Sequence, residues 1–223
     1  MRLPDADALA RAMERVGKAF EGVTARADED GCGRCFGAEE VALLRTPGVR
    51  LPADLVRRVA RKDPFHWHDR RSVVQRILAQ LVVVLAEGDD EPDLLVRGLA
   101  AAGWRGWPGE QGAAVAGFLD EWWAWTLRTG EPPVPACAVF ESCVTASSSV
   151  APWLRRWEAA GESVVARRHL ADGLRWWSEE LESGDSPFAW WWGSEAEARD
   201  AWQEVRAWVR GRSGPGEGSG GPA

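Results

Sequence analysis

The sequence predicts an all-α protein in which antiparallel helical pairs form a bundle or a short helical-repeat stack. Three observations lead to this fold class. Apolar residues recur every three or four positions over most of the chain, prolines and glycines stand where such runs begin and end, and no two alternating segments are joined by a hairpin turn. With 223 residues, 45% of them hydrophobic and 27% charged, the chain is long enough to bury one ample core.

The domain organisation is expected to be simple. We expect a single helical domain over residues 1–210. Three prolines fall within residues 129–135, so a weak hinge is expected at 130–135. Residues 211–223 consist mainly of Gly, Ser and Pro and are expected to form a disordered tail.

The N-terminal part of the chain predicts short helices separated by loops. The first helix begins behind Pro4, because apolar residues then recur on one helical face. Residues 28–35 break this pattern with two glycines and are expected to form a loop that carries two cysteines. Two further helices are expected at 38–44 and from about Pro52 onward.

The most hydrophobic helix is expected behind Asp69, whose carboxylate suits an N-cap. Apolar residues follow three-and-four spacing from Val73 to Leu85, which is typical of a central, buried helix. Its β-branched end, residues 82–84, also suits a strand. The unbroken helical spacing and the glycine stop at Gly88 favour a helix.

The rest of the chain continues the alternation of amphipathic helices and short breaks. Prolines or glycines separate the segments, and each segment carries an apolar face. The expected helices span residues 93–102, 115–127, 136–147, 150–160, 163–183 and 195–210.

The composition includes 15 tryptophans. The chain has no Tyr and no Asn, one Ile and two Lys, which are residues with AT-rich codons, whereas Trp, Arg, Ala and Gly have GC-rich codons. A GC-rich bacterial genome therefore accounts for the Trp content. Adjacent indoles cannot all face the core at helical spacing, so some are expected at a contact with another protein. The residues expected at this partner surface are Trp123, Trp125, Trp190 and Trp191.

The charge distribution argues against nucleic acid as a partner. The net charge is −7, with a small basic excess in residues 1–80 and a larger acidic excess in the remainder. Because the acidic part would repel phosphates, the arginines of the first part are interpreted as a solvated helix face. The N-terminus lacks the apolar region of a signal peptide, and the longest apolar run, residues 81–86, is too short to span a membrane. We therefore expect a cytoplasmic protein without membrane contact.

One stretch of the sequence gathers the chemistry of a site. Cys32 and Cys35 form a Cys-x-x-Cys pair, and His66 and His68 form a His-x-His pair. Zinc binds four ligands of the Cys or His type, and a turn that contains glycine lets two thiolates approach one ion. Pro64 favours extended backbone before the histidines, and an extended segment would place both rings on one side. The four residues are therefore the candidate metal ligands, and zinc is the only cofactor that the sequence suggests.

Three alternatives stay open for the same residues. One histidine together with Asp69 or a water could complete the zinc site. The cysteines could instead be a redox pair in which Arg34 lowers a thiol pKa, although no strand precedes them as such pairs usually require. In the simplest alternative, both cysteines stay reduced and serve only as small packing residues of the loop. One histidine then packs against or caps the next helix, and the other faces water.

The sequence predicts no catalytic residues. The nucleophile motif Gly-x-Ser-x-Gly, a phosphate-binding glycine-rich loop and a dinucleotide fingerprint are all missing. His169 lies on an expected helix between Arg168 and Leu170, where it is expected to pack rather than to act as a base.

Several short motifs occur along the chain: Cys32-x-x-Cys35, Glu39-Glu40 with Leu43-Leu44, the Leu-Pro-x-Asp-Leu segment at 51–55, Trp67-x-Asp69, Phe118-Leu-Asp-Glu-Trp122 and Trp153-Leu-x-x-Trp157. Together they resemble a family of uncharacterised bacterial all-helical proteins. The resemblance would cover residues 30–210, and it implies a helical fold and no activity. The chain departs from the family pattern in the long helix, where Arg76-Ile-Leu-Ala-Gln80 lacks the expected His and Pro.

Together these observations predict a cytoplasmic protein-interaction or scaffold protein of the helical-repeat type. Its expected partner is an unidentified protein or a second copy of the chain. The alternative is a zinc-binding or thiol-active protein that uses Cys32 and Cys35.

Overall fold

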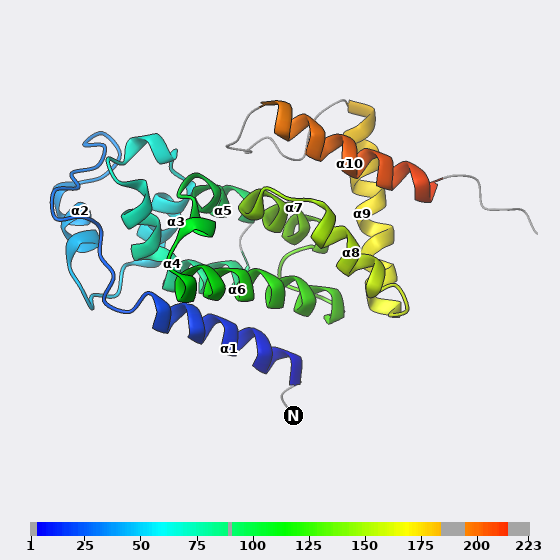
Figure 1. Ribbon diagram of the computed structural model, residues 1–223, viewed down its shortest axis with the longest axis horizontal. Helices are drawn as coiled ribbons and strands as arrows, with labels where there is room; N and C mark the ends of the chain where they lie inside the picture. The colour runs from blue at the N-terminus through cyan, green and yellow to red at the C-terminus, as the bar shows by residue number, and fades with distance from the viewer. Residues whose placement is uncertain (1–3, 89–90, 184–194, 214–223) are drawn as a thin grey trace, which may run out of the picture.

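The computed structural model confirms the all-α prediction. It describes residues 4–88, 91–183 and 195–213, and within them the chain forms ten α-helices, two short 3₁₀ helices and no β-strand (Figure 1). The elements are α1 (Pro4–Ala19), α2 (Ala38–Arg45), α3 (Ala53–Arg61), η1 (Pro64–His66), α4 (Arg70–Glu87), α5 (Pro92–Ala101), η2 (Trp104–Gly106), α6 (Gly109–Arg128), α7 (Ala136–Ser147), α8 (Ala151–Ala159), α9 (Val164–Ser183) and α10 (Glu195–Ser213).

The boundaries of α4 follow the local signals of the sequence. The side chain of Asp69 accepts a hydrogen bond from the backbone N–H of Ser72 at 3.2 Å, as an N-cap does. Gly88 follows the helix with a φ of 109°, a conformation that favours glycine. The valine triplet 82–84 lies inside α4, so helical spacing outweighed the β propensity of these residues.

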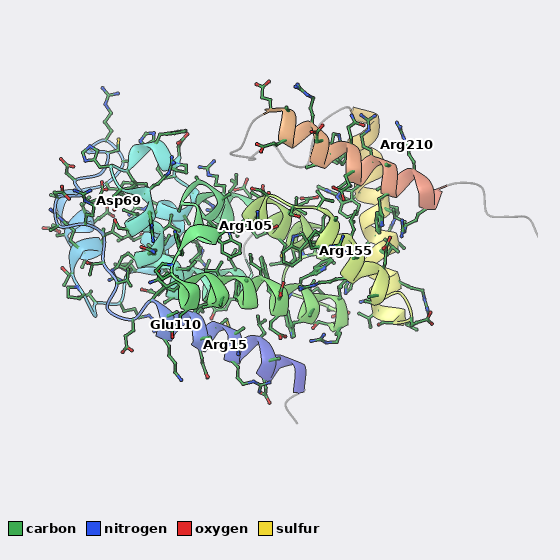
Figure 2. The ribbon with its side chains drawn as sticks, in the orientation of Figure 1. Arg15, Asp69, Arg105, Glu110, Arg155 and Arg210 are labelled. Carbon is green, nitrogen blue, oxygen red and sulfur yellow. The ribbon has the colours of Figure 1, made fainter. Side chains whose placement is uncertain are left out.

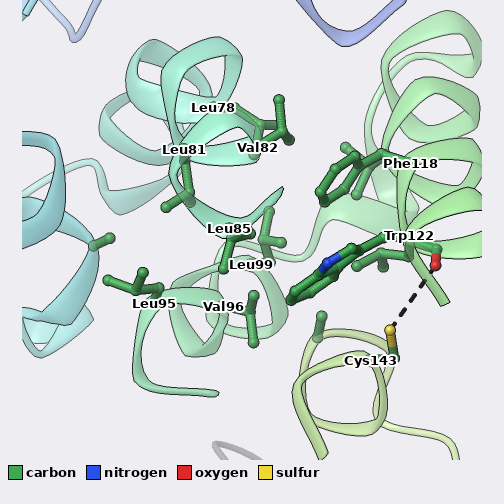
Figure 3. Close-up of a cluster of buried hydrophobic side chains, with 14 of the residues drawn as sticks. Leu78, Leu81, Val82, Leu85, Leu95, Val96, Leu99, Phe118, Trp122 and Cys143 are labelled. Atoms are coloured by element: carbon green, nitrogen blue, oxygen red, sulfur yellow. Dashed lines mark hydrogen bonds between the residues drawn. The ribbon is translucent and has the colours of Figure 1, made fainter. Parts of the chain in front are cut away.

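Helix α4 is central to the core of the N-terminal part of the fold. It contacts α1, α2, α3 and α5, and all of its leucines and all of its valines except the half-buried Val83 are buried. Phe118 and Trp122 of α6 pack toward the aliphatic side chains of α4 and α5 (Figure 3). On α7, the Sγ of Cys143 lies 3.9 Å from the carbonyl oxygen of Leu119 on α6, and this contact brings α7 against the same core.

The finer arrangement, antiparallel pairs in a bundle or a repeat stack, stays a prediction. Helix α5 packs most extensively against α7, and α1 against α6, so the largest contacts join helices that are not neighbours in the sequence. Figure 1 shows α2 and α3 at one end of the molecule and α9 and α10 at the other.

Five aromatic residues form a continuous cluster that joins α6, α7, α8, α9 and α10. Contacting rings have centroids 5.0 to 6.3 Å apart, a separation typical of favourable aromatic pairs. Each of the four indole N–H groups donates a hydrogen bond, so the cluster buries large side chains without leaving these donors unsatisfied. The members of this aromatic cluster are Trp123, Phe140, Trp157, Trp177 and Trp208.

Trp123 does not fit the expected partner surface. Its side chain is 0% exposed, because the rings of Phe140 and Trp157 cover it and its Nε1 donates to the carbonyl oxygen of Trp153 at 3.3 Å. Trp125 is half-buried and packs against the core. Trp190 and Trp191 lie outside the described residues.

The segment expected to be a hinge connects α6 to α7 and contacts other parts of the fold. Val134 is buried, and Pro133 lies against Gly88 at the end of α4. Residues 211–213 belong to α10 rather than to a disordered tail, and residues 214–223 lie outside the described residues. The single domain and the hinge stay predictions. In the described part of the chain, no helix combines the length and the apolar character that a membrane span requires.

The aromatic cluster provides a test of the packing. Replacing Trp123 by Ala should lower the free energy of unfolding by about 3–5 kcal/mol, because it removes a fully buried indole and leaves a cavity. Val164→Ala is a suitable control, because Val164 is 72% exposed and should change stability by less than about 0.5 kcal/mol. Urea denaturation measures both values, and an equal effect of the two substitutions would contradict the packing described here.

Candidate metal centre

The cysteine loop, residues 26–37, holds its two thiols by a tight turn. The carbonyl oxygen of Cys32 accepts hydrogen bonds from the backbone N–H groups of Cys35, at 2.8 Å, and of Phe36, at 3.1 Å. These bonds fold the chain back within four residues, so both half-buried cysteines take part in one cluster.

The histidine segment, residues 63–69, lies across from the cysteine loop. The side chain of Asp63 accepts a hydrogen bond from the backbone N–H of Phe65 at 2.9 Å and caps η1. His66 is the last residue of η1, and its Nδ1 lies 3.7 Å from the Sγ of Cys35. The ligand atoms of Cys32, Cys35 and His66 all lie within 4.8 Å of one another.

Glu29 fixes the cysteine loop to the histidine segment. Its side chain is buried, and its two carboxylate oxygens accept hydrogen bonds from the backbone N–H groups of Gly31 (2.9 Å), His68 (3.3 Å) and Asp69 (2.8 Å). A buried carboxylate that accepts several N–H groups is well satisfied, and its removal would leave those donors without partners. Glu29 therefore sets the position of His66 relative to the thiols.

Gly31 allows the loop to approach the core. Its φ is 60°, in the left-handed region, and a Cβ at this position would lie 2.8 Å from an atom of the Trp67 ring. The Trp67 ring also packs on Phe36, with centroids 4.7 Å apart. A side chain larger than hydrogen at residue 31 would therefore displace Trp67 and, with it, the segment that carries His66.

The environment activates one of the thiols. A hydrogen bond with the His66 side chain lowers the pKa of Cys32 to about 6, and hydrogen bonds with the Arg34 backbone and the Cys35 thiol act in the same direction. The expected effect of Arg34 thus comes from its backbone. Burial has the opposite effect on the other two cysteines: it raises the pKa of Cys137 to about 12 and that of Cys143 well above its usual value.

The three side chains fit a zinc ion. Zinc prefers Cys thiolate and His nitrogen, at about 2.3 Å and about 2.0 Å respectively, and a tetrahedral ion would hold an S and an N ligand about 3.6 Å apart. The distance of 3.7 Å between Cys35 Sγ and His66 Nδ1 matches this separation. The lowered pKa of Cys32 also favours the thiolate that a metal requires.

His68 does not join the predicted set of four ligands. Its Nδ1 lies 2.9 Å from Oδ1 of Asp30, and the two side chains are exposed. With Glu29 they form a second group of potential ligands, but the Glu29 carboxylate is already bonded to backbone N–H groups. The separation of the histidines has a local cause. Trp67 is buried between them, and the rings of His66 and His68 meet different parts of the cysteine loop.

Asp69, the alternative fourth ligand, is also committed elsewhere. Its carboxylate caps α4, and it lies with the cysteine loop at the end of the molecule opposite to Arg210 (Figure 2). Among the described residues, the cluster thus contains two thiols and one imidazole, with no fourth Cys, His, Asp or Glu ligand.

Sequence reasoning missed Glu29. Nothing in the spacing of the sequence distinguishes it from its neighbours Asp28 and Asp30, because its role depends on N–H groups about forty positions away in the chain, at His68 and Asp69. The prediction for His169 agrees with the structure: the side chain is buried, and its Nε2 lies 2.8 Å from the carbonyl oxygen of Thr129.

No protein-family model, no curated protein and no solved structure matches this chain. The interpretation of the cluster therefore rests on its geometry and chemistry.

The thiol environment generates a prediction for the metal-free protein. Iodoacetamide should alkylate Cys32 with a pH midpoint near 6, because the thiolate is the reactive form. In His66→Ala the midpoint should move upward toward that of an ordinary thiol, since the largest cause of the lowered pKa is gone. Mass spectrometry of the alkylated peptides as a function of pH measures both midpoints.

Cys137 is the internal control for this measurement, because burial keeps its thiol protonated at neutral pH. If Cys32 reacted with the same pH dependence in the original protein and in His66→Ala, the described contact with His66 would not exist in solution.

Proposed function

We propose that this protein binds one zinc ion through Cys32, Cys35 and His66. The observation that carries the proposal is the convergence of two thiols and one imidazole within 4.8 Å, from two segments that are more than thirty positions apart in the chain. A water would take the fourth position, as in zinc sites with three protein ligands.

The proposed role of the ion is to hold the cysteine loop against the histidine segment. The cysteine loop consists of turns and the histidine segment of one short 3₁₀ helix with its flanking residues, and the buried Glu29 carboxylate links them by hydrogen bonds. Metal ligation would add bonds across the same junction, so the free energy of binding would stabilise this part of the fold. The open fourth position would also admit an external ligand, which a closed four-ligand site would not.

Metal analysis tests this proposal. Protein loaded with zinc and then dialysed should retain about one zinc per chain, and Cys32→Ser or His66→Ala should retain less than about a tenth of it, because each removes one of three ligands. His68→Ala is the matched control, since His68 pairs with Asp30 outside the cluster and should leave the zinc content unchanged. Inductively coupled plasma mass spectrometry measures the content, and a chelator should lower the Tm of the loaded protein.

Two results would separate zinc binding from the other readings of the cluster. Loss of zinc in His68→Ala with retention in His66→Ala would mean that another ligand set holds the metal. If the original protein retains no zinc but forms a Cys32–Cys35 disulfide reversibly with an oxidised dithiol, the thiol-active alternative is the correct one.

Interaction with another protein is the second candidate function. We propose the bacterial cytoplasm as its location, because all four cysteines are free and thiols stay reduced there. A surface groove of about 590 Å³ lies beside the proposed zinc site, lined by Phe65, Trp67, Arg70 and Arg71 among others. Phe65 is 74% exposed, and the guanidinium of Arg70 lies 5.7 Å from its ring centroid. An exposed aromatic ring flanked by arginines suits an acidic segment of a protein partner, and the acidic part of a second copy of the chain provides one.

Light scattering after size-exclusion chromatography tests this second function. The chain should form dimers as its concentration rises, less so at high salt because screening weakens the charge contribution. Phe65→Ser should reduce dimer formation, whereas Val164→Ser, which alters an equally exposed residue on α9, should leave it unchanged. A monomer at every concentration and at low salt would exclude self-association.

A further inference from the structure

A separate cleft of about 870 Å³ opens between the helices of the middle and C-terminal parts of the fold. Its walls come from the end of α4, the start of α5, the proline segment 133–135, α7 and α9. The volume falls within the range of sites that hold small molecules. The zinc proposal involves none of these residues.

The walls of this cleft are strongly acidic. Each of the four helices contributes at least one carboxylate, and no Lys or Arg is among the described residues that line the cleft. Arg97, on α5, acts on Asp93 electrostatically, and Arg175, on α9, forms an ion pair with Asp172, but neither arginine lines the cleft. The carboxylates are Glu87 on α4, Asp93 on α5, Glu141 on α7, and Asp172 and Glu180 on α9.

Glu141 carries the strongest argument for a ligand. Its Oε1 accepts a hydrogen bond from Nε1 of Trp177 at 2.9 Å, and the Trp176 indole adds a weaker one. Burial nevertheless raises the pKa of Glu141 to about 8, and the charges of Asp93 and Glu180 act in the same direction. No described Lys or Arg lines the cleft, and this half-buried carboxylate accepts hydrogen bonds from neutral indole donors.

The remaining walls are apolar. Pro133, Val134 and Pro135 face the cleft together with Ala138. Trp176 also lines it, and this indole is 49% exposed. A large aromatic surface beside carboxylates attracts cations with an organic body, because the ring face stabilises the charge and the apolar walls cover the alkyl part.

The spacing of the carboxylates distinguishes an organic cation from a metal ion. Groups of three or more ligand atoms close enough to hold a metal occur among the described residues only at the cysteine loop and the histidine segment. The acids of the cleft are therefore too dispersed to surround one compact ion, whereas a chain with several ammonium groups can contact them one by one.

We infer that this cleft binds an aliphatic polyamine, with one ammonium group at Glu141, its alkyl chain against Trp176 and the prolines, and its other ammonium groups at Glu87 and Asp93. The inference goes beyond the proposed zinc site and is independent of it.

The sign of the pH dependence follows from the groups that face the cleft. Glu141 is mostly neutral at pH 7 and ionises as the pH rises through about 8, so the affinity for a polyamine should increase over this interval. Burial also raises the pKa of Asp93, and Cys137, with a pKa of about 12, stays neutral. The facing titratable groups are Glu87 on α4, Asp93 on α5, Cys137 and Glu141 on α7, and Asp172 and Glu180 on α9.

Isothermal titration calorimetry with spermidine tests the inference on the full chain. Glu141→Gln should weaken binding at least about tenfold and abolish the increase in affinity near pH 8, since it removes the charge but keeps an acceptor for Trp177. Trp176→Leu should weaken binding without changing the pH dependence. Glu110→Gln is the matched control, because Glu110 is an exposed acid at the start of α6 (Figure 2). The affinity of this variant for spermidine should stay within about twofold of that of the original protein.

Three results would overturn the inference. The first is the absence of spermidine binding by the original protein. The second is an equal loss of affinity in Glu141→Gln and Glu110→Gln, which would mean attraction to the net negative charge of the chain. The third is displacement of spermidine by equimolar Mg²⁺, which would assign the cleft to a metal ion.

Discussion

Removal of the apolar helix faces from water is the constraint on which the rest of this structure depends. The described residues contain no β-ladder, so each helix buries its apolar face against other helices. In the N-terminal part the aliphatic face of α4 serves this purpose, and in the C-terminal part the aromatic cluster does so. The two parts meet where Phe118 and Trp122 of α6 pack beside α4 and α5.

Both candidate sites lie at the margins of this packing and depend on it. Trp67 is held in the core, Gly31 rests on its ring, and Glu29 bonds the start of α4 to the cysteine loop. The thiols and His66 therefore meet because a packed ring and a buried carboxylate fix the two segments. The acidic cleft depends on the packing in a similar way, because α7 and α9 bring Glu141 and its neighbours to one cavity.

The local features of the chain were predictable because their causes are local. The valine triplet was correctly assigned to a helix from its spacing, and the cap at Asp69 followed from the residue type and its position. The pairing of Cys32 with Cys35 also follows from a turn of four residues. The sequence also suggested His66 as a candidate, but it offered His68 equally, and only the packing of Trp67 between them separates their roles.

The sequence by itself thus determined that the chain is helical, how α4 begins and ends, and which short segment carries the metal-binding residue types, since hydrogen bonds and side-chain spacing within a few positions set these features. It placed the start of α6 at residue 115 rather than Gly109 and the end of α10 at 210 rather than Ser213. The tertiary structure decided the rest. It buried Trp123, which helical spacing alone could not distinguish from an exposed indole. It also gave Glu29 three backbone partners and placed Glu141 in a cleft that no described Lys or Arg lines. These outcomes depend on which helix faces meet, and packing sets those contacts between residues that are distant in the chain.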